Sequence, residues 1–214
     1  MIRKFLFLPA LTVALQAVRA GIDLTPMPGE YRAEGITIQQ LIFIDDKRKV
    51  TYEPPRHWSW RGGADWLQLT PAGTMFAEAS IRARPLAVPQ LLDGNTMLLL
   101  KEKFLNSLPP GSQKINLLKE EQNPVVLDNK LSYAVTASYQ VIGETFVRTA
   151  LFVNLADTQL CFTMTARQND FEKLNQSFRT SILSWHWIEE SRTAQNSEPT
   201  IVTAPASQTA MLTN

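Results

Sequence analysis

Three tryptophans and two arginines lie together in one short segment of the chain. Trp58, Trp60 and Trp66 fall within nine residues, and Arg56 and Arg61 accompany them. Exposed tryptophan and arginine side chains often anchor protein interfaces, and an indole ring can also stack on a sugar. If these side chains are exposed, they mark a binding site for a partner or a glycan. If the rings are buried, they belong to the core.

The two histidines of the chain stand beside tryptophans. His57 precedes Trp58, and His186 lies between two further tryptophans. Alternate side chains of an extended segment point to opposite faces, so the tryptophans would seal the core while the histidines face solvent or pack nearby. The alternative is a histidine pair that meets near a carboxylate such as Asp65, where it would bind a metal or move protons in a cryptic hydrolase.

The usual signatures of catalysis and nucleotide binding are missing from the sequence. There is no Gly-x-Ser-x-Gly nucleophile elbow, no Walker loop and no Gly-x-Gly-x-x-Gly. The only cysteine, Cys161, lies in an alternating apolar segment, which favours a small packed residue over a nucleophile. We therefore predict no enzymatic activity, no catalytic residue, no cofactor and no bound metal.

Residues 1–20 have the pattern of a secretory signal peptide, with a charged start, an apolar middle and small residues before Gly21. The apolar run is about 13 residues, whereas a membrane-spanning helix needs about 20. The alternative is an uncleaved signal-anchor. We expect a periplasmic or extracellular protein with no transmembrane segment once the signal is removed.

Removal of this segment changes the charge balance of the chain. The remaining 18 basic and 20 acidic residues give a formal net charge of −2. Such a protein has no electrostatic reason to bind nucleic acid. The basic run at 47–49 follows two aspartates and indicates a solvated turn, with phosphate binding as the alternative.

The rest of the chain divides into three parts. Residues 21–35 mix proline and glycine with polar residues and predict an irregular lead-in, residues 36–188 predict one folded domain, and residues 189–214 predict a disordered polar tail. In the domain, strands are expected at 36–44, 49–52, about 64–69, about 75–84 and 115–119. A helix through 98–105 follows a cap at 93–95.

The C-terminal half of the domain has the clearest periodicity. Apolar and polar residues alternate over 131–141, as in an antiparallel strand with one buried face, and strands at 146–154 and 159–166 complete a meander. A helix follows, with Phe171, Leu174, Phe178 and Ile182 along one stripe that should cover the meander. Asn169 and Glu172 have the spacing of a capping box at its start.

Three of these segments together resemble the Mog1/PsbP/DcrB-like superfamily. They are the strand that runs into Tyr52-Glu-Pro-Pro-Arg-His-Trp58, the helix that ends in Leu108-Pro-Pro-Gly-Ser112, and the meander closed by the helix with Phe178-Arg-Thr-Ser-Ile182-Leu-Ser184. The resemblance covers about 36–187 and implies an α/β (α+β) fold, an antiparallel sheet sandwiched by helices.

The resemblance also implies a role without chemistry, because members of that superfamily act chiefly as accessory or assembly proteins. We expect an exported accessory or interaction protein whose partner is an envelope protein or complex. The alternative is a small-ligand or glycan-binding protein that uses the space between the sheet and a helix.

Overall fold

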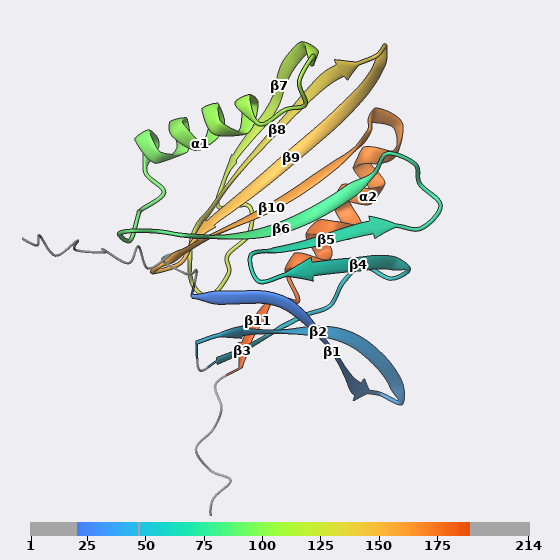
Figure 1. The fold of residues 1–214 in the computed structure, drawn as a ribbon, viewed down its shortest axis with the longest axis vertical. Coiled ribbons are helices and arrows are strands. Elements are labelled where there is room, and N and C mark those ends of the chain that lie inside the picture. Colours follow the sequence, from blue (N-terminus) through green and yellow to red (C-terminus); the bar gives the residue numbers. More distant parts are fainter. Residues whose placement is uncertain (1–20, 47, 189–214) are drawn as a thin grey trace, which may run out of the picture.

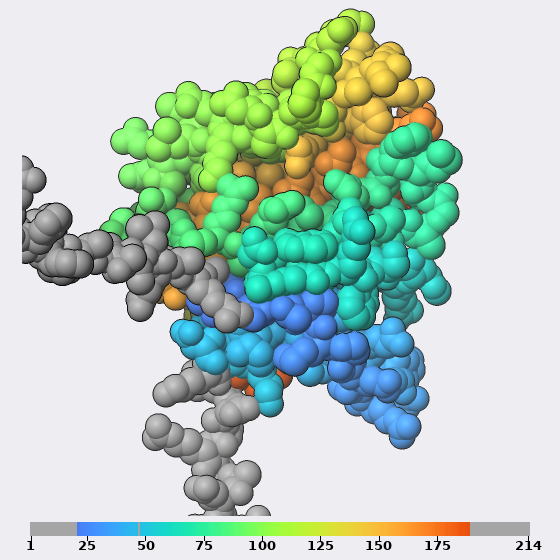
Figure 2. All heavy atoms as spheres, in the orientation of Figure 1, coloured from blue at the N-terminus to red at the C-terminus, as the bar shows by residue number. Residues whose placement is uncertain are grey.

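The computed structural model describes residues 21–46 and 48–188, which form two antiparallel sheets and two helices (Figure 1). The smaller sheet has the strand order β1-β2-β3-β11, with bounds β1 Ile22–Ala33, β2 Ile36–Asp45, β3 Arg48–Tyr52 and β11 His186–Ile188. Its β1–β2 hairpin projects from the body of the molecule, as the blue spheres in Figure 2 show. The predicted α+β class is confirmed, although the sequence patterns did not indicate a second sheet.

The larger sheet has seven strands in the order β4-β5-β6-β10-β9-β8-β7. Its strands are β4 Trp58–Gly63, β5 Trp66–Pro71, β6 Glu78–Pro85, β7 Gln113–Gln122, β8 Ser132–Val141, β9 Glu144–Asn154 and β10 Thr158–Arg167. The predicted meander forms β8, β9 and β10. The segment 58–63, for which no strand is predicted, forms the edge strand β4 and leads into β5 through a tight turn.

Helices α1 (Gly94–Asn106) and α2 (Gln168–Ile182) cover opposite faces of the larger sheet. Along β8, Val135 packs in the cluster under α1, whereas Ala134 belongs to the larger cluster on the α2 side. Both residues are buried, so the prediction of a strand with one buried face is wrong here. On the α2 side β8 carries small residues such as Ser132 and Ala134, which make the sequence alternate between apolar and polar but still pack closely there.

The helix ends differ in how well the sequence predicts them. Asp93 caps α1 as expected, because its Oδ1 accepts a hydrogen bond of 2.8 Å from the Thr96 N–H. The capping box predicted for α2 is wrong, since the helix begins at Gln168 and has no side-chain cap. The chain passes directly from β10 into α2, and Arg167, the last residue of β10, takes the N-cap position without a capping bond from its side chain.

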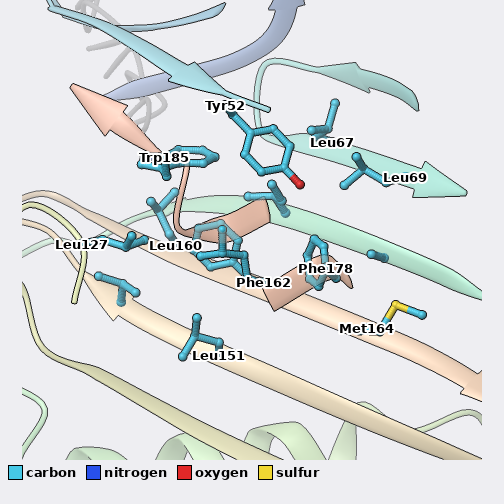
Figure 3. Close-up of a cluster of buried hydrophobic side chains, with 14 of the residues drawn as sticks. Tyr52, Leu67, Leu69, Leu127, Leu151, Leu160, Phe162, Met164, Phe178 and Trp185 are labelled. Carbon is cyan, nitrogen blue, oxygen red and sulfur yellow. The ribbon is translucent and has the colours of Figure 1, made fainter. Parts of the chain in front are cut away.

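The main core lies between the larger sheet, α2 and the smaller sheet (Figure 3). Trp185 is 4% exposed and its ring lies 5.4 Å from Phe43, 5.7 Å from Tyr52 and 5.4 Å from Phe162, measured between centroids. These rings come from β2, β3 and β10, so one indole joins the two sheets. The hydroxyls of Tyr52 and Ser181 share a buried hydrogen bond of 2.8 Å.

The irregular lead-in predicted for 21–35 is wrong, because most of it forms β1 and pairs with β2. Pro26 and Pro28 are tolerated because β1 is an edge strand and its register shifts between Asp23 and Met27. The folded domain therefore begins about fifteen residues earlier than predicted. The predicted signal peptide (1–20) and polar tail (189–214) lie outside the described residues.

Candidate binding groove

The segment between β3 and β4 lies against the polar side of α2. Pro54 and Pro55 end β3 because a proline cannot donate a ladder hydrogen bond. The Glu53 N–H donates instead to Ser184 Oγ beyond the C-terminus of α2, at 2.8 Å. This bond joins positions 131 residues apart and holds Arg56 and His57 beside the helix.

Two adjoining cavities, of about 230 and about 490 Å³, open between this segment and α2. We call them together the α2 groove. Arg56 and Lys173 line both cavities. The groove is lined by Glu53, Pro54, Pro55, Arg56, His57, Trp58, Pro71, Ala72, Thr74, Asn169, Asp170, Lys173, Leu174, Gln176, Ser177, Thr180, Ser181 and Ser184.

The middle of the α2 groove is positively charged. Arg56 and Lys173 are both exposed, and within residues 21–46 and 48–188 neither makes an ion pair or a hydrogen bond through its side chain. Each cavity also has one acidic lining residue, Asp170 in the smaller and Glu53 in the larger. Glu53 is engaged, because it accepts a hydrogen bond of 2.7 Å from the Tyr31 hydroxyl, and this bond raises the pKa of Tyr31.

The structure separates the residues that the sequence groups together. In the β4–β5 register Trp58 and Trp60 stand opposite Pro71 and Leu69, on the α2 face, whereas Trp66 lies on the other face opposite Arg82 of β6. Trp58 is half-buried and stacks on Phe178 of α2 at 6.3 Å and 10°. Trp60 is 37% exposed at the sheet edge.

The two arginines are separated in the same way. Arg61 lies on the face of Trp66, where its Nε donates to Gln68 Oε1 at 2.7 Å, and Gln68 Nε2 donates to Glu78 Oε2 at 2.7 Å. Only Arg56 and Trp58 of the five candidate residues line the α2 groove. The five therefore do not form one surface.

The two histidines belong to different sheets: His57 directly precedes β4 of the larger sheet, and His186 begins β11 of the smaller one. His57 lines the groove in a left-handed backbone conformation, with φ of +64°, and His186 is exposed on β11 between the buried Trp185 and Trp187. Among residues 21–46 and 48–188, no group of three or more His, Cys, Asp or Glu could hold a metal ion. Cys161 packs beside the cluster under α1, and burial raises the pKa of its thiol.

Sequence reasoning did not identify Lys173 as a site residue. Its only local signal is its place on the polar side of α2, opposite the apolar stripe that ends at Ile182. Such a lysine is ordinarily a solvated charge. Its significance comes from Arg56, 117 positions earlier in the chain, which the segment after β3 brings to the same cavities.

No family model matches this chain, and none of the curated proteins compared with it matches. The solution structure of cyanobacterial PsbP (CyanoP) from Synechocystis sp. PCC 6803 is similar over 84% of this chain and 99% of that one, with a TM-score of 0.50 and 12% identity. This likeness confirms the PsbP-like fold that the sequence resemblance predicts. At such an identity it is a likeness of fold alone.

Two further crystal structures are similar to this chain. One is a protein of unknown function, PA94, from Pseudomonas aeruginosa, which matches over 73% of this chain and 94% of its own with a TM-score of 0.40 and 15% identity. The other, from Bacteroides thetaiotaomicron VPI-5482, covers 66% of this chain and 46% of that one, with a TM-score of 0.42 and 10% identity. In the described part of this chain, neither helix has the length and apolar character needed to cross a membrane.

Proposed function

We propose that this chain is an exported, non-enzymatic accessory protein that binds a partner in the periplasm or outside the cell through the α2 groove. Export is expected from the pattern of residues 1–20. An accessory role is what the superfamily resemblance implies. The α2 groove adds a location for binding, and its charges indicate the chemistry of the group that the partner presents.

One observation carries the proposal, which is that Arg56 and Lys173 line both cavities without an ion pair among the described residues. Two positive charges in one groove repel each other weakly, and here no ion pair within the described residues offsets that repulsion. An anionic group placed between them would form charge-assisted hydrogen bonds with both. The partner should therefore present a carboxylate or a phosphate, as an acidic segment of an envelope protein does.

The remaining lining of the groove suits a polar segment. Ser177 offers a hydroxyl along α2, Thr180 can accept through its hydroxyl oxygen while its proton goes to the Gln176 carbonyl, and the half-buried ring of Trp58 lines the smaller cavity. Such groups hydrogen-bond an extended chain and exclude water from the central charges, which strengthens electrostatic contacts. The charge term should weaken as salt rises well above about 0.1 M, where the Debye length falls below about 10 Å.

The test is photo-crosslinking in the native cell envelope, with a photoreactive amino acid in place of Ser177. The expected result is one dominant crosslinked partner. That product should be lost when Arg56→Ala and Lys173→Ala are combined, because the two charges that attract the partner are gone. We choose these residues over Trp58, since its stacking on Phe178 means that Trp58→Ala would also disturb the core.

The matched control combines Arg32→Ala and Lys130→Ala, which removes two exposed positive charges from other parts of the chain. This control should keep the crosslink. Loss of the product in both double variants would indicate a general charge effect and would overturn the assignment of the groove. Retention of the product in the Arg56→Ala, Lys173→Ala variant would do the same.

A further inference from the structure

A further cavity, of about 280 Å³, lies at the end of the larger sheet, on the face that α1 covers. In β8 the side chains of Val135 and Ala137 pack under α1, and Tyr139 comes next on the same face. Helix α1 ends at Asn106, shortly before Pro109 and Pro110, and Arg148 Nη1 of β9 donates to the Ser107 carbonyl at 2.9 Å beside that end. Beyond the end of α1, Tyr139, Val141 and Phe146 line the cavity.

The cavity walls are mainly carbon. Tyr139 and Phe146 stack at 5.9 Å and 20° across β8 and β9, and Val141, Pro109 and Phe76 complete the walls. In Figure 1 the loop that leads into β6, which carries Phe76, and the β8–β9 turn lie at the same end of the sheet. An apolar cavity with a few polar groups is the usual form of a small-molecule site.

Phe76 is held over this cavity in an unfavourable conformation. Its φ is +61°, which a bulky side chain rarely adopts, and its ring is 59% exposed. The Arg167 guanidinium lies 4.7 Å from the ring centroid, and Arg167 Nε lies 3.5 Å from Glu144 Oε2. The fold thus buries little of this aromatic ring, although its backbone is strained. Strain that packing does not explain is typical of functional sites.

Tyr139 supplies the second observation. The residue as a whole is 2% exposed, but its hydroxyl is not among the buried polar atoms that lack a partner within residues 21–46 and 48–188, so this oxygen reaches solvent at the cavity that Tyr139 lines. Burial raises the pKa of Tyr139, Arg148 lowers it and the nearby Glu78 carboxylate raises it, so the hydroxyl keeps its proton and can donate or accept.

We infer that this cavity binds a small uncharged or cationic aromatic molecule that carries one hydrogen-bonding group. The ring would lie between Phe76 and the Tyr139–Phe146 stack, and its polar group would pair with the Tyr139 hydroxyl. A cavity of about 150 Å³ already accepts a benzene ring, so about 280 Å³ suffices for a fused ring system of indole size. Glu78 is the charged residue in the cavity lining and repels an anion there, while Arg148 and Arg167 lie beside Tyr139 and Phe76 but outside the lining. The site lies on the opposite face of the sheet from α2, so its ligand is independent of the proposed function.

The test uses indole as the probe and saturation-transfer NMR on the whole protein, with the dissociation constant taken from a titration. Indole should bind saturably, and the matched anion indole-3-acetate should bind more weakly. Tyr139→Phe keeps the ring and removes the hydroxyl, so it should weaken indole binding by about 2- to 12-fold, the range expected for one hydrogen bond. Met75→Ala, next to Phe76 but outside the cavity lining, should leave binding unchanged.

Phe76→Gly separates a binding role from a structural one. Glycine tolerates the positive φ, so the variant should keep its melting temperature within about 4 °C while its indole binding falls by about 2- to 12-fold. A large drop in melting temperature would make Phe76 a structural residue. Absence of saturable binding, or equal binding by indole-3-acetate, would overturn the inference. Binding of a tryptophan-containing peptide but not of free indole would overturn it in favour of a protein partner.

Discussion

Replacing Trp185 by alanine should remove one of the main aromatic contacts between the two sheets. The indole is 4% exposed; it stacks on Phe43 of β2, lies tilted to Tyr52 of β3 and meets Phe162 of β10 edge to face. A buried tryptophan removes about 150–250 Å² from water, which at about 25 cal/mol per Å² is about 4–6 kcal/mol. That figure is an upper bound, because the unfolded chain already buries part of its surface. Truncations of this kind cost about 3–5 kcal/mol.

The measurement is the free energy of unfolding in urea, followed by far-UV circular dichroism, together with the melting temperature. For a protein of this size about 3–5 kcal/mol corresponds to a fall of about 6–20 °C. A domain is stable by only about 5–15 kcal/mol in total, so the variant should be close to unfolding. Met75→Ala, at a side chain that is 72% exposed, should change the free energy by no more than about 0.5 kcal/mol.

A second variant distinguishes the packing of the ring from its polar group. Trp185 Nε1 is buried, and no described residue accepts its hydrogen bond. Trp185→Phe keeps an aromatic ring and removes this unsatisfied donor, so it should cost less than about 1.5 kcal/mol. If Trp185→Ala costs less than about 1 kcal/mol, or no more than Trp185→Phe, the indole does not join the sheets and the reasoning fails.

Three other predictions concern single side chains. Burial raises the pKa of Tyr52, whereas an unfolded tyrosine loses its proton near pH 10. The free energy of unfolding should therefore be constant below about pH 10 and fall above it by about 1.4 kcal/mol per pH unit for each such tyrosine. In urea unfolding, Tyr52→Phe should show a smaller alkaline slope than the unmodified protein. Asp93→Ala should lower the melting temperature by removing the α1 cap and Asp93→Asn should largely preserve it, and equal losses in both would exclude a capping role. Iodoacetamide should modify Cys161 much more slowly in the folded protein than in urea, because burial raises the pKa of the thiol; equal rates by mass spectrometry would contradict its packing under α1.

Local periodicity predicted the elements whose partners are adjacent in sequence. The alternation over 131–141 and the stripe through Phe171, Phe178 and Ile182 give β8 and α2, because neighbouring residues alone decide which side chains share a face. The same reasoning predicted α1 with its Asp93 cap. It failed for β1, where prolines obscure the pattern and the pairing with β2 supplies the order.

The candidate site shows the limit of the same reasoning. Sequence proximity placed Trp58 and Trp66 in one cluster, yet the β4–β5 turn puts them on opposite faces of the sheet. Conversely, Arg56 and Lys173 carry no shared local signal, and the α2 groove exists only because the chain returns along α2 beside the segment after β3.

The sequence by itself therefore determined the α+β class, the meander, both helices and their apolar stripes. Only the tertiary structure decided which faces of the sheet each tryptophan occupies, which charges stay without a partner and which part of a sheet face a helix leaves open. The physical reason is the range of the interactions. Helix and strand periodicity depends on neighbours a few residues apart, whereas a groove or a cavity depends on which distant segments pack together to bury their apolar faces.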